Sequence, residues 1–458
     1  MTERPAASLD RRLGPFDAAA VVVSNVIGGG IFFVPILVAQ LVPNSPGILL
    51  VWLAGGALAF AGAMAYAELA ALRPRAGGEY VYLHDAFGPL AGFLSGWTSF
   101  VAGFSGAIAA SSVALAEYVG RFFPAAGDAT PLVTIPLPYL PLVFSAKSLV
   151  ALLTIVVLTI VHMRGLGPGR VTQNSLAALK VAALLVFLVA GFAIGQGADS
   201  SAAPTTVSVG AGGIVLALIP VMFTYSGWNA AAYLAEEIRS PERNVPLALG
   251  LGTLAVVVIY LGLNALYLYA LPAPELAAVK MTLIDTVADR LFGAGIGNLI
   301  ALFTIVSIAA SVSAMILAGP RVYFAMARDG LFFPSAMRVH PRFRAPGPAI
   351  LAQTVWSGVL VLSGQLSQLV SYTGFAIVLF SGLAVAAVFV LRRRNPELPR
   401  PFRAWGYPWA PGVFVLASVV ILVNEIWRNP GTSLAGLAVI LCGVPVYLWM
   451  VRGKSAAA

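Results

Sequence analysis

The sequence predicts an all-α integral membrane protein. Of its 458 residues, 59% are hydrophobic and only 10% are charged, and the mean hydropathy is +0.91. Many segments exceed the roughly 20 consecutive apolar residues that a helix needs to cross a bilayer. The formal net charge of +9 follows from the loops that join these segments, as shown below. We therefore expect the lipid bilayer, and no nucleic acid, as a partner.

The apolar segments divide into twelve predicted transmembrane helices. The weakest division is the polar stretch 365–368, which separates the ninth span from the tenth. The predicted spans are residues 17–40, 46–71, 91–120, 147–163, 175–195, 211–235, 247–271, 297–324, 348–364, 371–391, 411–427 and 433–451.

The basic residues set the predicted orientation. With the N-terminus inside, 21 of the 27 lysine and arginine residues lie on the inner side and 5 on the outer side. The remaining one, Lys180, lies within a span. Cytoplasmic loops of membrane proteins carry an excess of Lys and Arg. We therefore predict a multi-pass protein of the cell (cytoplasmic) membrane with both termini in the cytoplasm.

The first span contains three consecutive glycines, Gly28, Gly29 and Gly30. Glycine weakens a helix because it loses more backbone entropy than alanine and offers no side chain for packing. In lipid, non-helical backbone survives only where protein covers it or where it lines a watery cavity. The glycines therefore predict an interruption of the helix. The alternative is a small-residue surface for close helix packing.

A second interruption is predicted in the sixth span, 211–235. Ser226 and Gly227 lie near its middle and are flanked by polar Thr224 and Asn229. Polar groups at bilayer depth are expensive unless they line a pathway or a site. Span 1 starts inside and span 6 starts outside, so the two interrupted helices run antiparallel. This pattern is typical of inverted repeats that hold a substrate between them near the bilayer midplane.

The inverted repeat defines the predicted domain organisation. Each repeat has five spans, and the first span of each is unwound at the midplane. The predicted parts are a cytoplasmic tail (1–16), the first repeat (17–195), the second repeat (211–391), a cytoplasmic loop (392–410), two further helices (411–451) and a cytoplasmic tail (452–458).

The two interruptions also predict the chemistry of the ligand. A broken helix exposes free N–H groups where its second half begins and free carbonyls where its first half ends. The N–H groups of Gly29, Gly30 and Ile31 suit a carboxylate. Nearby carbonyls suit an ammonium group, so an α-amino acid fits both ends. The carbonyls are those of Val26, Ile27, Phe223 and Thr224.

Several motifs resemble those of the amino acid–polyamine–organocation superfamily. Residues 27–32 (IGGGIF) are similar to its Gly-Ser-Gly-Ile-Phe break, and residues 223–229 (FTYSGWN) with 236–246 resemble its L-type amino acid transporter branch. The resemblance covers nearly the whole chain and is most specific in spans 6 and 8. Further similar stretches are 320–330 and 394–403.

This resemblance implies the LeuT fold, in which five plus five inverted spans are followed by two more. The chain departs from the family pattern at Gly29, where many relatives carry serine. That difference removes one hydroxyl from the expected carboxylate site, but the backbone donors remain.

In the resembling family, a lysine at the position of Lys180 lies where sodium-coupled members of the fold bind a sodium ion. Its ammonium bridges the unwound part of span 1 and span 8. The resemblance therefore implies sodium-independent transport, with partners near Gly28 and at the hydroxyl of Ser311 or Ser313. The alternative is a side chain that snorkels to the cytoplasmic interface. Coupling to protons through this lysine stays open.

Residues of spans 3 and 6 are predicted to select the substrate. Relatives that take cationic amino acids often carry aspartate where Ser226 or Asn229 stands here. An unpaired cation in a poorly solvated pocket costs several kcal/mol, so we predict neutral amino acids. Phe223 is a candidate gate, with simple helix packing as the alternative. The candidates in span 3, whose serines can instead bond to their own helix backbone, are Ile108, Ser111 and Ser112.

We therefore predict a sodium-independent transporter that exchanges neutral L-amino acids by alternating access. One rival is a proton-coupled importer of amino acids, cationic amino acids or polyamines with the same fold. The other is a membrane-embedded enzyme or sensor, but an enzyme needs paired carboxylates, a His cluster or an activated nucleophile at bilayer depth. We find none, so no catalytic residue, metal or cofactor is predicted. The single cysteine, Cys442, lies in the last apolar segment, so no disulfide-linked partner chain is expected.

Overall fold

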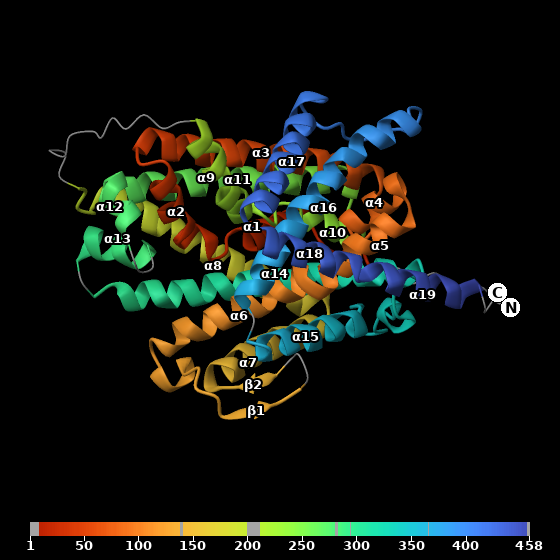
Figure 1. The fold of residues 1–458 in the computed structure, drawn as a ribbon, viewed down its shortest axis with the longest axis horizontal. Helices are drawn as coiled ribbons and strands as arrows, with labels where there is room; N and C mark the ends of the chain where they lie inside the picture. Colours follow the sequence, from red (N-terminus) through yellow and green to blue (C-terminus); the bar gives the residue numbers. More distant parts are fainter. Residues whose placement is uncertain are drawn as a thin grey trace.

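The computed structural model describes residues 9–137, 141–198, 211–279, 283–293, 295–364 and 366–455. In these ranges the chain is mainly helical, and the long helices run side by side (Figure 1). The helices of the first half are α1 (Pro15–Val26), α2 (Val34–Leu41), α3 (Ser45–Leu72), α4 (Glu79–Phe87), α5 (Pro89–Thr98), α6 (Phe104–Gly120), α7 (Ala146–Met163) and α8 (Leu166–Ala193).

The second half begins with another short pair of helices and then repeats the long ones. Its helices are α9 (Ala211–Tyr225), α10 (Ala230–Tyr233), α11 (Pro241–Ala270), α12 (Ala273–Ala278), α13 (Leu283–Phe292), α14 (Gly297–Arg328), α15 (Gly347–Leu362), α16 (Leu366–Arg394), α17 (Trp409–Arg428), α18 (Pro430–Leu441) and α19 (Gly443–Ser455).

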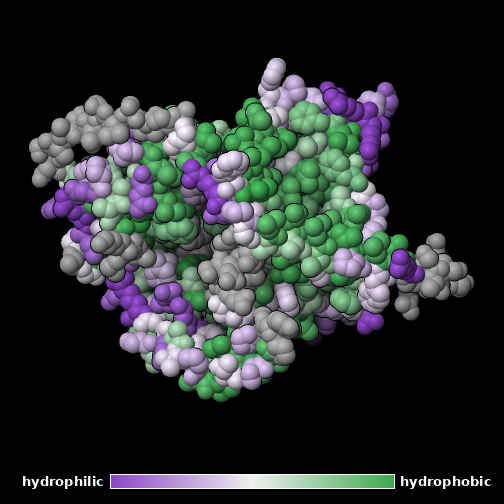
Figure 2. All heavy atoms as spheres, viewed as in Figure 1, coloured by the Kyte–Doolittle hydropathy of each residue, from purple (hydrophilic) through white to green (hydrophobic). Residues whose placement is uncertain are grey.

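The surface suits a protein that crosses a bilayer. Hydrophobic residues cover the middle of the face shown in Figure 2, and hydrophilic residues gather toward its left and right ends. Within the described ranges, nine helices are long and apolar enough to cross a membrane. Three shorter apolar helices, Pro15–Val26, Gly212–Tyr225 and Gly347–Leu362, coincide with the predicted spans 1, 6 and 9.

Spans 1 and 6 are interrupted at the predicted positions. α1 ends at Val26 and α2 begins at Val34, with a single 3₁₀ turn at Gly30–Phe32 between them. α9 ends at Tyr225, and the short α10 begins at Ala230. α1 packs against α10, and α2 packs against α9. Because the first half of each helix contacts the second half of the other, the two interrupted helices run antiparallel.

The remaining contacts follow a five-helix offset. α3 packs against α11, α6 against α14, and α7 against α15, so spans 2, 3 and 4 contact spans 7, 8 and 9. α8 contacts α11 and α14, and α16 makes the equivalent contacts with α3 and α6. Spans 5 and 10 therefore occupy matching places on either side of the interrupted pair.

Two local features lie outside the predicted pattern. The connection after α6 forms a small antiparallel hairpin, β1 (Val133–Ile135) with β2 (Leu142–Phe144), in which Val133 pairs with Phe144. Its β-branched residues favour extended backbone, and no regular element is predicted between spans 3 and 4. Span 3 is continuous from Pro89 to Gly120 but contains a π-helical turn at Ser99–Gly103. This turn changes which residues of α6 face the site.

Candidate functional site

A cavity of about 210 Å³ lies between the two interruptions. Sites for drug-sized ligands usually measure about 300–1,000 Å³, so this one suits a smaller molecule. α4, α5, α6, α10, α14 and α16 also contribute to its walls. The residues that the two interruptions contribute are Asn25, Val26, Gly28, Gly29, Gly30, Phe223, Thr224, Ser226, Gly227 and Asn229.

The glycines of the first interruption leave backbone donors free. Among the described backbone hydrogen bonds, none has the N–H of Gly29, Gly30 or Ile31 as donor, whereas Gly28 N donates to Val26 O at 2.8 Å. A Cβ at Gly29 would meet nothing within 4 Å, and a Cβ at Gly30 would lie 3.0 Å from the Thr224 side chain. Free N–H groups at a helix start attract anions. This edge of the cavity can therefore hold a carboxylate.

Gly227 brings the second interruption against the first. Its φ of +100° is a conformation that side chains rarely adopt. A Cβ there would lie 2.6 Å from Asn25 Nδ2 and 3.0 Å from Asn25 O. Asn25 Nδ2 donates to Gly227 O at 3.3 Å. The close approach of the two chains thus requires glycine.

Tyr260 of α11 joins the carbonyl ends of the two broken helices. It is fully buried, and its hydroxyl lies 2.9 Å from Val26 O and 3.3 Å from Thr224 O. These carbonyls are at the ends of α1 and α9, where the helix leaves them unpaired. The sequence gives little sign of this contact, since Tyr260 is one aromatic residue in a long apolar span.

Lys180 of α8 covers the carbonyl end of α1. The side chain is fully buried, and Nζ donates to Ser24 O at 3.1 Å, to Ser311 Oγ at 3.0 Å and to Ile27 O. Ser311 Oγ also donates toward Ser24 O and Ile27 O, at 2.8 and 3.0 Å. The ammonium therefore lies at the partially negative end of the α1 dipole. It bridges the interruption and α14 and does not reach an interface.

Ser313 does not take part in this contact. Its hydroxyl instead lies 2.9 Å from His162 Nε2 of α7. Two residues along a helix differ by about 200° in direction, so Ser311 and Ser313 point to nearly opposite sides. Of the two hydroxyls predicted as partners of Lys180, only that of Ser311 accepts a hydrogen bond from it. The expectation for Ser313 is corrected.

The prediction for span 3 is also corrected. Ala107 and Ser111 line the cavity, whereas Ile108 and Ser112 are fully buried and are not part of its lining. Ile108 packs in a separate apolar cluster. The π-helical turn at Ser99–Gly103 adds one residue to the helix and so rotates α6 by about 100°. A sequence pattern read with regular helical spacing misses that rotation.

Phe223 lies between two cavities. It lines the one between the interruptions and also a second, apolar one of about 300 Å³. The second cavity reaches Phe33 and Leu37 of span 1 and Ile421 of α17. The Phe223 side chain, partly exposed, therefore separates the site from a further opening. This position fits the predicted gate.

The cavity contains a carboxylate that the sequence prediction overlooked. Glu79, the first residue of α4, is 7% exposed and lines the wall. Of the described lining residues, it alone is charged at neutral pH. The pocket therefore contains a carboxylate, contrary to the expectation that it lacks a counter-charge for a cation. However, Glu79 Oε1 already accepts from Tyr66 Oη at 2.6 Å and from Asn229 Nδ2 at 2.8 Å.

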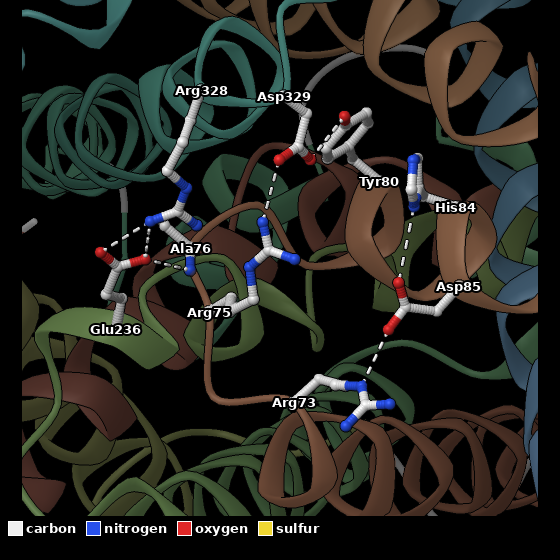
Figure 3. Close-up of polar contacts among 9 residues, drawn as sticks. All are labelled: Arg73, Arg75, Ala76, Tyr80, His84, Asp85, Glu236, Arg328 and Asp329. Carbon is white, nitrogen blue, oxygen red and sulfur yellow. Dashed lines mark hydrogen bonds and ion pairs between the residues drawn. The ribbon is translucent and has the colours of Figure 1, made fainter. Parts of the chain in front are cut away.

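A cluster of ion pairs joins the end of α14 to the segment between α3 and α4 and to the segment after α10 (Figure 3). Arg328, at the end of α14, donates to both oxygens of Glu236, at 3.0 and 2.9 Å, and the Ala76 N–H donates to the same carboxylate at 3.0 Å. Asp329 accepts from Arg75 at 3.0 Å and from the Tyr80 hydroxyl at 2.9 Å. The connection between α3 and α4 is thereby tied to the ends of α10 and α14.

A buried ion pair and the segment that precedes α1 add further contacts at this end of the bundle. Arg321 pairs with Glu237 at 2.9 and 3.0 Å, and both side chains are almost fully buried. Leu13 forms a bridge with Ile238, and Arg239 N donates to Leu13 O at 2.9 Å. The segment that precedes α1 is thus bound to the segment that follows α10.

An apolar helical body with two antiparallel interrupted helices around a small polar cavity defines a multi-pass membrane transporter. The model of the family described as "Amino acid permease" matches residues 13–450. The chain belongs to this family, whose members are transporters and not enzymes.

Three relatives cover nearly the whole chain. Large neutral amino acids transporter small subunit 2 of Homo sapiens is 29% identical over 96% of this chain and 80% of its own length. The serine/threonine exchanger SteT of Bacillus subtilis is 29% identical over 98% of both chains. The b(0,+)-type amino acid transporter 1 of Mus musculus is 28% identical over 99% of this chain and 90% of its own length.

Proposed function

We propose that this protein exchanges neutral L-amino acids across the cell membrane by alternating access, without sodium. One observation carries the proposal. The free N–H groups of Gly29 and Gly30 lie at a small cavity whose lining also includes Phe223 and Thr224, at the carbonyl end of α9, whereas the buried Ile31 is not part of that lining. The first group of atoms matches a carboxylate and the second an ammonium. An α-amino acid carries both groups on one carbon.

The architecture behind this proposal is the LeuT fold with twelve spans. The crossed contacts of the interrupted helices and the five-helix offset between spans 2–4 and 7–9 support an inverted repeat. α17 and the pair α18–α19 then form the two further spans. Substrate sites of such folds lie between the repeats, where the cavity is found.

Sodium independence rests on Lys180. Its ammonium fills the space beside Ser24 O, Ile27 O and Ser311 Oγ with a fixed positive charge. A sodium ion at the same oxygens would need the lysine to leave. The lysine is fully buried among these partners, so its departure would leave an unpaired charge in the protein interior.

The preference for neutral substrates rests on the wall of the cavity. Ser226 and Asn229 are uncharged, and the single carboxylate, Glu79, is occupied by hydrogen-bond donors of the protein. Little free negative charge is left for a cationic side chain. Two of the relatives are named for neutral amino acids or for serine and threonine, which agrees with this reading.

The proposed orientation places both termini and the Arg328 end of the bundle in the cytoplasm. The ion pairs at that end would then form the cytoplasmic gate, which must open once in each transport cycle. We also propose that the chain acts without a disulfide-linked partner. Its single cysteine, Cys442, is free and follows α18 within the last predicted span.

Counterflow in proteoliposomes tests the proposed function. Vesicles loaded with one unlabelled neutral amino acid should take up another, labelled one faster than empty vesicles do, in a sodium-free medium. The same panel should include lysine, arginine and a polyamine, which should stimulate uptake little. If no amino acid inside the vesicles accelerates uptake, the proposed function is wrong.

A further inference from the structure

Glu79 is placed where two parts of the molecule meet. It begins α4, a short helix that connects spans 2 and 3, and its side chain reaches the wall of the cavity. The neighbouring Ala76 and Tyr80 take part in the ion-pair cluster at the Arg328 end of the bundle (Figure 3). The same short stretch of chain therefore contributes both to the wall of the cavity and to the ion-pair cluster.

The carboxylate is surrounded by neutral donors. Tyr66 Oη of α3 donates to Oε1 at 2.6 Å, and Asn229 Nδ2 donates to the same oxygen at 2.8 Å. The Tyr233 hydroxyl also hydrogen-bonds to Glu79, and Asn229 Nδ2 lies 3.1 Å from that hydroxyl. Glu79 thus holds together two residues, Asn229 and Tyr233, that line the cavity beside it.

No cation neutralises this carboxylate in the described structure. The hydroxyls that hydrogen-bond to it are those of Tyr66 and Tyr233, which are neutral. Several nearby cations are paired with other acids: Arg321 with Glu237, and Arg328 with Glu236. The charged and titratable groups on the elements that pack against α4 or supply its partners are Glu68, Tyr80, His84, Asp85, Glu236, Glu237, Arg321, Tyr323, Arg328, Asp329, Arg392, Arg393 and Arg394.

We propose that Glu79, in its ionised form, is a positioning residue of the binding cavity that holds Asn229 and Tyr233 in place, so that its protonation slows exchange. This inference rests on the proposed function, since it assigns a role within that amino acid site. Every partner of Glu79 acts as a donor in the observed arrangement. A proton on the carboxyl group would add one more donor to this ring and weaken the hold on Asn229.

Burial supports a proton equilibrium in the accessible pH range. Desolvation raises the pKa of Glu79 to about 6, although the hydrogen bonds from Tyr66, Tyr233 and Asn229 oppose that rise. The ionised form therefore prevails above this pH and the protonated form below it. Exchange should be fast at neutral pH and should decrease as the pH falls through this range.

The test measures exchange of a neutral amino acid between about pH 5 and pH 8, with equal pH on both sides of the membrane. Wild-type exchange should fall by about tenfold toward pH 5, as expected for one titrating group. Glu79→Gln, which keeps the size but cannot ionise, should vary by less than about twofold over the same range.

Two tyrosine variants provide a second test that does not depend on the behaviour of Glu79→Gln. Tyr66→Phe removes a donor to the ionised carboxylate, which should raise the pKa of Glu79. The midpoint of the pH profile of exchange should therefore move to higher pH. Tyr82→Phe is the matched control, because Tyr82 lies on α4 with Glu79 and its hydroxyl has no hydrogen-bond partner in the described structure. Its midpoint should remain that of the wild type.

The outcomes separate this inference from the proposed function. A flat wild-type profile, or a Glu79→Gln profile that still falls toward low pH, would overturn the role of Glu79 while exchange itself stands. An unchanged midpoint in Tyr66→Phe would also contradict it. Absence of amino acid exchange by the wild type at every pH would instead refute the proposed function.

Discussion

The two interruptions differ in the partners that their exposed backbone carbonyls find. At the first, a buried amino group covers the carbonyl end of the broken helix, because Lys180 Nζ donates to Ser24 O and Ile27 O. At the second, the carbonyl of Phe223 accepts from Ser226 N at 3.0 Å, and that of Thr224 lies 3.3 Å from the Tyr260 hydroxyl. Neither has a charged partner among the described contacts.

This difference divides the roles of the two interruptions. The carbonyl end of α1 is already neutralised, so the first interruption is left to offer its N–H groups to an anion. The second keeps its partial negative charge for a ligand cation. A zwitterion placed between the two would bind the free N–H groups of the first through its carboxylate and the carbonyls of the second through its ammonium group.

Replacement of Lys180 should have the largest effect. Lys180→Ala leaves Ser24 O and Ile27 O with Ser311 as their remaining partner. The three lost buried hydrogen bonds, about 3 kcal/mol together, should reduce exchange by about 100-fold in counterflow. Lys147→Ala is the matched control, because Lys147 pairs with the exposed Glu117 outside the site.

This variant also separates the exchanger from its closest rival. If Lys180→Ala retains exchange but loses uptake driven by a pH gradient, the lysine serves proton coupling. The protein would then be a proton-coupled importer, and the assignment of Lys180 as a fixed charge would be wrong.

The first interruption can be blocked directly. Gly30→Leu places a side chain against Thr224, where even a Cβ would lie only 3.0 Å away. Amino acid binding to the purified protein should weaken by at least about 30-fold, while the protein remains folded and monodisperse. Gly167→Ala in α8 is the control, since a Cβ there meets nothing within 4 Å and Gly167 does not line the cavity, and it should keep its affinity. Equal affinity of Gly30→Leu and wild type would remove the carboxylate site from the first interruption.

The second interruption is tested at Gly227. Gly227→Ala is strained by the positive φ, at about 1–2 kcal/mol, and its Cβ would approach Asn25 Nδ2 to 2.6 Å. We expect exchange to fall by about tenfold and the thermal midpoint to decrease by a few degrees. Gly412→Ala in α17, where a Cβ meets nothing within 4 Å, should leave both unchanged. A fully active Gly227→Ala would show that contact between the two interruptions is dispensable.

The smallest effect is expected from sodium. Replacement of sodium by choline on both sides of the membrane should change the exchange rate by less than about twofold, because a fixed ammonium stands where an ion would bind. A saturable dependence of exchange on sodium would contradict the role given to Lys180.

Much of the fold follows from sequence patterns that act over a whole helix. The apolar segments, the excess of basic residues on one side and the two polar interruptions predict the spans and place the cavity between Gly28–Gly30 and Ser226–Gly227. These signals are strong because lipid tolerates few exceptions to apolar, hydrogen-bonded helices.

The missed parts depend on local geometry. The π-helical turn in span 3 rotates Ile108 and Ser112 away from the cavity, and no residue type marks that turn in the sequence. Glu79 belongs to a connection between spans, where a carboxylate usually faces water. Only the folded chain shows that the first residue of α4 is buried and lines the cavity.

A structure of the protein with a bound neutral amino acid would show whether the two interruptions hold its two charged groups. We expect the ligand carboxylate within hydrogen-bond distance, about 3 Å, of the N–H groups of Gly29, Gly30 or Ile31. We expect the ammonium group near the carbonyls of Phe223 and Thr224. An amino acid bound with its carboxylate away from the first interruption, or outside the cavity between the two, would contradict this expectation.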